Sequence, residues 1–154
     1  MVAVTVEDVE RAYDVRGAEW VTRVTDDAIA RACGTPALER GQGYVDAERV
    51  RSVTTGDQGR MLLGVVAGGR PTPYSTMIAS DGDLDGEPRW SGRCSCPVTT
   101  SCKHVAAVLL AVREELVEQA DPGARWRSEL QSVLSRAERA AAVGHPEPEQ
   151  LGLL

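Results

Sequence analysis

Three cysteines and one histidine lie within eleven residues near the middle of the chain. One residue separates Cys94 from Cys96, five residues follow, and one residue separates Cys102 from His104. Thiolates and imidazoles are the ligands with which proteins hold Zn²⁺ in tetrahedral sites. Because four protein ligands leave no open position for water, this pattern predicts one structural Zn²⁺ rather than a hydrolytic metal.

The spacing inside each pair indicates which elements must position the ligands. On an extended strand, Cys94 and Cys96 project from the same face, and Pro97 then turns the chain away. Deep inside a helix, Cys102 and His104 would lie about 200° apart around the axis. They converge only if Cys102 caps the helix and His104 lies in its first turn, where the helix dipole also favours a thiolate. The pattern therefore predicts a ββα-like zinc module: a strand, a knuckle and the start of a helix.

Two other interpretations of the cluster are weaker. A disulfide framework requires an oxidising compartment, and Cys94 and Cys96 are badly placed to pair with each other. A catalytic dyad of Cys102 and His104 requires a third residue to orient it, and none is evident. We therefore expect a binding protein and no enzyme, because an enzyme would need an open metal position.

The composition fits one modest domain with a thin core. The chain has 154 residues, a net charge of −6, 4% aromatic residues and no phenylalanine. The core must be built from Val, Leu, Ala and Met, and a bound metal ion would help to stabilise it. The first residues do not resemble a secretory signal, and no apolar run approaches the roughly 20 residues of a membrane span. We expect a cytoplasmic protein whose cysteines stay reduced.

Hydrophobic periodicity and turn residues predict the elements that position the site. Residues Ala18–Val24 are expected to be extended. One helix should end at Cys33, and a second should open at Thr35 and Pro36. Four short strands are then expected, at Val50–Thr54, Met61–Ala67, Tyr74–Ala79 and Arg89–Cys94, with an Asp/Gly-rich loop at Asp81–Gly86.

Two amphipathic helices should follow the knuckle. The apolar positions of the first are Val105, Val108, Leu109, Val112 and Leu116, and those of the second are Trp126, Leu130, Val133, Leu134 and Ala137. Together the elements predict an α+β fold: a small antiparallel sheet of three or four strands with N-terminal helices, a zinc knuckle and two C-terminal helices. The expected boundaries are an N-terminal extension at 1–25, the main domain at 26–121 with the zinc module at 89–118, a C-terminal helix at 124–143, and a flexible tail at 144–154.

The remaining residues with useful chemistry are expected to be structural. Cys33 lies on an apolar helix face and should be a buried thiol. Tyr44, Trp90 and Trp126 could stack on nucleic-acid bases, but core packing is favoured because aromatic residues are so few.

The ligand order C-x-C-x(n)-C-x-H, formed by Cys94, Cys96, Cys102 and His104, resembles the SWIM-type zinc finger family. The proline after the second cysteine and the apolar helix HVAAVLLAV also resemble that family. The segment ALERGQGYVDAERVRSV, followed by strands and the finger, is similar to the N-terminal region of bacterial Swi/Snf-type helicase-like proteins. The resemblance spans roughly Asp26 to Trp126. It implies a DNA-binding or protein-binding role, accessory to a helicase-like ATPase in the same or a separate chain. The chain itself has no Walker-A loop or DExH box.

Two binding functions follow from these observations. Nucleic-acid (DNA) binding requires that Arg93, Lys103 and Arg89 gather on one basic face. The alternative is a zinc-stabilised protein–protein interaction module with no nucleic-acid binding, which the acidic net charge and the lack of a basic run favour. Neither function involves a membrane.

Overall fold

The computed structural model describes residues 12–144. Residues 1–11 of the predicted N-terminal extension and 145–154 of the predicted flexible tail lie outside this range. The described residues divide into two compact units, 12–117 and 118–144. In chain order the elements are β1 (Ala12–Tyr13), the 3₁₀ helix η2 (Glu19–Arg23), α1 (Asp26–Cys33), α2 (Thr35–Asp46), β2 (Val50–Gly56), the 3₁₀ helix η3 (Asp57–Gly59), β3 (Met61–Val66), β4 (Tyr74–Leu84), β5 (Glu87–Cys94), α3 (Lys103–Ala120) and α4 (Ala124–Gly144).

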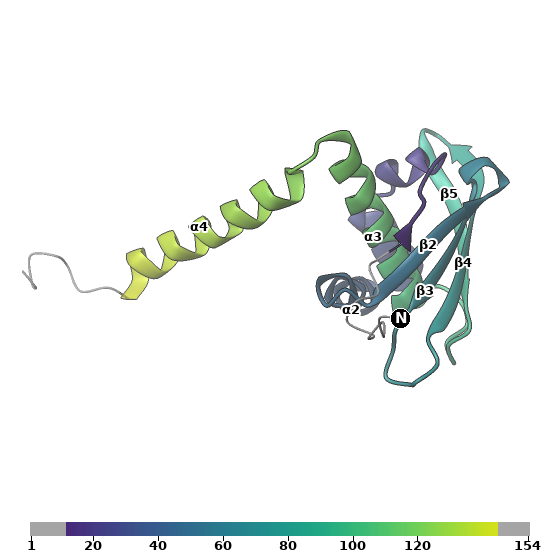
Figure 1. Ribbon diagram of the computed structural model, residues 1–154, viewed down its shortest axis with the longest axis horizontal. Coiled ribbons are helices and arrows are strands. Elements are labelled where there is room, and N and C mark those ends of the chain that lie inside the picture. Colours follow the sequence, from purple (N-terminus) through teal and green to yellow (C-terminus); the bar gives the residue numbers. More distant parts are fainter. Residues whose placement is uncertain (1–11, 145–154) are drawn as a thin grey trace, which may run out of the picture. The chain divides into compact units, whose positions relative to one another are not determined.

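The first unit is built on a five-stranded sheet with strand order β1-β2-β3-β4-β5 (Figure 1). Strands β2 to β5 form the predicted antiparallel meander, joined by short turns. Strand β1 adds a two-residue parallel edge to β2, which the sequence analysis did not predict. The mixed architecture, with N-terminal helices and two C-terminal helices, confirms the predicted α+β fold.

Helix α3 packs against one face of the sheet (Figure 1), and His104 is its second residue. Its first half is buried on every side, from His104 to Val112, rather than along a single apolar stripe. Two close approaches explain this. A Cβ on Gly92 of β5 would lie 2.6 Å from Val105, and a Cβ on Gly41 of α2 would lie 3.0 Å from Ala106. Because Gly92 and Gly41 have no side chains, the sheet and α2 can both pack closely against the start of α3.

Replacing Gly41 by valine should destabilise the first unit by about 1–3 kcal/mol, because the new side chain would collide with fixed groups of α3. The nearest atoms are the Cβ of Ala106 and the backbone nitrogen of Ala107, and neither can rotate away. Gly43 is the matched control, since nothing lies within 4 Å of its Cβ position in the same helix. Thermal unfolding of both variants checks this: an equal response would contradict the close approach.

The segment Ala18–Val24 is not extended, and this prediction was wrong. Glu19–Arg23 form the 3₁₀ helix η2. Val15, Ala18, Val21 and Val24 recur every three residues and are all buried. A 3₁₀ helix brings residues three apart onto one side, whereas a strand would send alternate residues to opposite faces.

A turn does lie within the loop predicted at Asp81–Gly86, but it is shorter than expected, because β4 continues to Leu84. Only Asp85 and Gly86 form the turn, with φ angles of 53° and 82°. Such left-handed values at both central residues are those of a type I′ hairpin, for which Asp-Gly is a preferred sequence. The ladder then pairs Leu84 with Glu87 directly across the turn.

The second unit contains the end of α3 from Glu118 onward, the turn that follows it, and α4. Arg127 forms an ion pair with Asp121, and the Gly123 amide donates to the Glu118 carboxylate at 2.8 Å. Trp126 is 64% exposed, so its predicted core packing was wrong. Tyr44 and Trp90 do pack against the core of the first unit. Among residues 12–144, no helix is long and apolar enough to cross a membrane.

Candidate metal centre

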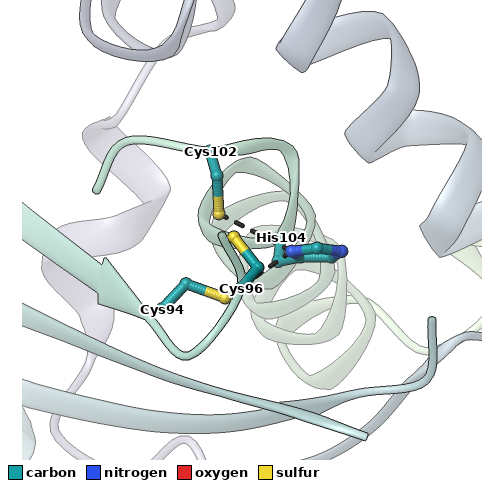
Figure 2. A group of neighbouring side chains, drawn as sticks. All are labelled: Cys94, Cys96, Cys102 and His104. Atoms are coloured by element: carbon teal, nitrogen blue, oxygen red, sulfur yellow. Dashed lines mark hydrogen bonds between the residues drawn. The ribbon is translucent and has the colours of Figure 1, made fainter. Parts of the chain in front are cut away.

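The four predicted ligands come together at the junction of β5 and α3 (Figure 2). Their sulfur and nitrogen ligand atoms all lie within 4.8 Å of one another, and all four residues are buried. Cys94 ends β5, and Cys102 immediately precedes Lys103, the first residue of α3. The predicted placement of Cys102 at the cap and His104 in the first turn is therefore confirmed.

Backbone hydrogen bonds fold the knuckle between the two pairs. The Cys94 amide donates to the Thr99 carbonyl at 2.7 Å, and the Thr99 amide donates to the Cys96 carbonyl at 3.1 Å. Thr99 and Ser101 take left-handed φ angles of 69° and 47° to close the loop. This short turn aims the Cys96 thiol back toward Cys94 and the helix (Figure 2).

The separations fit one tetrahedral metal ion. The Cys94 sulfur lies 3.5 Å and the Cys102 sulfur 3.7 Å from Nδ1 of His104. A tetrahedral ion with bonds of about 2.3 Å to sulfur and about 2.0 Å to nitrogen would hold sulfur and nitrogen about 3.5 Å apart. These two separations therefore match those of ligands that share one tetrahedral ion.

Two tyrosine rings fix the orientation of His104. The Tyr74 ring stacks on the imidazole at a centroid distance of 4.4 Å, and the Tyr44 ring meets it edge-on at 5.3 Å. Nδ1 faces the thiols (Figure 2), while Nε2 is buried and has no hydrogen-bond partner in the described part of the chain. The aromatic packing therefore selects Nδ1 as the ligand nitrogen without the usual hydrogen bond to the other ring nitrogen.

Protonation of the site is set largely by burial. Burial raises the pKa of Cys94 to about 12 and also raises the pKa of Cys102. For Cys96, burial is outweighed by backbone N–H groups of Thr99 and Val98, and its pKa is lowered. Burial, helped by the nearby Lys103, lowers the pKa of His104. The imidazole is thus neutral at pH 7, as a ligand must be, and a metal ion would displace protons from the thiols.

Cys33 lies beside the centre but outside the group of four. It lines a cavity of about 270 Å³ together with Cys96, Cys102 and Lys103. Burial and the nearby Cys102 raise the pKa of Cys33 to about 11. The residue is half-buried rather than fully buried as expected. Because it is a nearby thiol outside the group of four, it is a suitable control for the ligand thiols.

The structure places the three predicted nucleic-acid-binding residues in two locations. Arg89 and Arg93 are exposed on β5, alternating with the buried Gly92 and Cys94, so they lie on the outer face of the sheet. Lys103 lies on the helix side, with its Nζ 5.6 Å from the centroid of the Tyr44 ring. These residues do not form one face, and the role predicted for them stays a prediction.

Three cations lie over the two tyrosine rings: Arg49, Arg70 and Lys103. Together with Arg40, we call them the basic cluster. The Arg49 and Arg70 guanidinium groups lie 5.6 Å and 4.6 Å from the centroids of Tyr44 and Tyr74. Arg40 lines the same cavity as Lys103. The four residues come from separate elements of the chain, and no local sequence pattern joins them.

No acidic partner neutralises the basic cluster within residues 12–144. Elsewhere in that range six arginines form ion pairs: Arg16, Arg23, Arg31, Arg60, Arg113 and Arg127. On α2, Glu39 and Asp46 are seven residues apart, so they lie on one face of the helix, and Arg40 lies on a different face. Asp46 accepts a hydrogen bond from Gln42. Four cations without an ion pair among the described residues therefore lie around His104 and its two tyrosines.

No family model, no curated protein and no solved structure matches the chain.

Proposed function

We propose that the chain is a zinc-binding module of the SWIM type that binds nucleic acid, with DNA as the expected ligand, and that it is not an enzyme. The observation that carries the proposal is the basic cluster beside the buried Cys₃His centre. An accessory role to a helicase-like ATPase, in the same or a separate chain, is part of the same proposal.

The donor set favours Zn²⁺ among the common metals. Three thiolates and one imidazole in a tetrahedral arrangement are typical of structural zinc, whereas hard cations such as Mg²⁺ and Ca²⁺ prefer oxygen. With four protein ligands the ion would tie the end of β5 to the start of α3. Its role is then to hold the fold, which supports a binding function over catalysis.

The charge balance supports a polyanionic ligand. One Zn²⁺ with three thiolates carries a net charge of −1. The four cations of the basic cluster exceed that charge by three, and none has an ion pair in the described residues. Arg49, Arg70 and Lys103 are held over tyrosine rings. Cations positioned in this way can contact phosphate groups of a nucleic acid.

A second candidate function, protein docking, rests on the outer face of the sheet. Leu63 and Met77 pair across β3 and β4 and are 43% and 42% exposed. Arg93 lies in the same row on β5. An apolar pair bordered by a cation would suit a partner with apolar and acidic side chains.

Titration of zinc-loaded protein with short single- and double-stranded DNA and RNA, followed by fluorescence anisotropy, tests the first function. We expect saturable binding whose affinity falls steeply with salt, with a slope of about −0.9 for each phosphate contacted in a duplex. Absence of binding at low salt would overturn the proposal and leave protein docking as the function to pursue.

A further inference from the structure

Helix α4 carries an apolar seam that the described part of its unit leaves exposed. Trp126, Leu130 and Val133 are 64%, 42% and 51% exposed. They follow each other at spacings of four and three residues, and Ala137 and Ala140 continue the series. This is the heptad spacing of a coiled coil, with residues 126, 133 and 140 at position d and residues 130 and 137 at position a.

The rest of the helix surface matches the same heptad. Leu134, at position e, widens the seam and is 54% exposed. Every residue at positions b, c and f whose side chain the structure describes is polar: Ser128, Gln131, Ser132, Ser135, Glu138 and Arg139. The helix therefore has one narrow apolar stripe, the width that a single partner helix covers.

We propose that this stripe pairs with the same helix of a second copy of the chain, in antiparallel orientation, with Leu130 opposite Val133 of the partner copy. The pairing is closed by a two-fold axis, so each contact occurs twice. Trp126 then lies opposite Ala137 of the partner copy, and the largest side chain of the seam meets one of the smallest. Such a match of large and small residues fills the interface without a void.

Charge complementarity fixes both the orientation and the register. In an antiparallel pair the g positions of the two helices face each other, and here they are Glu129 and Arg136. The proposed register sets Glu129 against Arg136 of the partner copy. A shift by one heptad would set Arg136 against Arg136 or Glu129 against Glu129, which repel. A parallel pair would set the g positions against Leu134 and Ala141, with no charge pair.

Sedimentation equilibrium of the zinc-loaded full chain tests the pairing. We expect a mass of twice 16.5 kDa that dissociates on dilution. Leu130→Glu should leave a monomer, while Ser132→Glu, on the polar face, should leave the dimer intact. Zinc content and thermal unfolding of the first unit should be unchanged in both variants, which separates loss of pairing from loss of folding.

A charge exchange tests the register. Glu129→Arg and Arg136→Glu should each weaken the dimer by about tenfold or more, and the double exchange should restore it, because the opposite-charge pair is then rebuilt. A chain that is monomeric at all concentrations, or a dimer that survives Leu130→Glu, would overturn the proposal. A double exchange that fails to restore the dimer would overturn the antiparallel register. The mass readout needs no nucleic acid, so this outcome is independent of the proposed function.

Discussion

Replacing Cys96 by serine is expected to abolish stoichiometric zinc binding and to remove the stabilisation that zinc gives to the first unit. The binding free energy of structural Zn²⁺ is about 10–16 kcal/mol. If the four ligands share it equally, the loss of one ligand lowers the affinity for zinc by roughly two to three orders of magnitude. Cys96 is a suitable target because it lies in the knuckle and belongs to no helix or strand. Loss of its thiolate removes a ligand without opening a cavity in the core.

Zinc content after gel filtration against a chelator, and thermal unfolding with and without zinc, measure this effect. Zinc at 1,000 times its dissociation constant should stabilise the wild-type protein by about 4 kcal/mol and should stabilise the variant far less. Cys33→Ser is the matched control, since this thiol lies beside the centre but outside the group of four. A Cys96→Ser variant that keeps one zinc per chain and its thermal stability would refute the structural site.

The metal site was predictable from sequence because its geometry is local. The ligands span eleven residues, and the i,i+2 spacings alone require a strand end and a helix start. The antiparallel meander was predictable for a similar reason: each strand pairs with its neighbour in sequence across a short turn.

The errors came from patterns that were compared with the wrong template. Spacing by three at Val15, Ala18, Val21 and Val24 indicates a 3₁₀ helix, and Asp85-Gly86 indicates a two-residue hairpin turn. The exposure of Trp126 had no such signal. The hydrophobic periodicity of its helix is the same whether the chain's own core or a partner protein covers the apolar stripe.

The basic cluster depends on tertiary structure and could not be found by sequence analysis. Arg49 precedes β2, Arg70 lies in the turn between β3 and β4, and Lys103 opens α3. Sheet register brings the first two to one end, where Val50 pairs with Val66 and Val66 with Tyr74. The cations of β5 are instead sent to the outer face by the alternation of the strand.

The cluster makes a second prediction with a large effect. Replacing Arg49, Arg70 and Lys103 together by glutamine should weaken binding to duplex DNA by roughly two to three orders of magnitude at 0.1 M salt. The slope of affinity against salt, on logarithmic axes, should become shallower by about 2.7, since each lost phosphate contact accounts for about 0.9. The measurement is the anisotropy titration at several salt concentrations, with zinc content determined first because Lys103 lies between two ligands.

The matched control replaces three other arginines by glutamine: Arg16, Arg31 and Arg60. Their exposed ion pairs contribute little to stability, so this triple variant changes the net charge equally and leaves the basic cluster intact. If both variants lost affinity to the same degree, long-range charge rather than a defined site would account for binding. If affinity for DNA fell only when Arg89 and Arg93 were replaced, the phosphate contacts would lie on the outer face of the sheet. If the basic cluster is the binding site, only the variant lacking Arg49, Arg70 and Lys103 should bind DNA more weakly and with a shallower dependence of affinity on salt. The reason is that these cations without ion pairs lie together beside the metal centre.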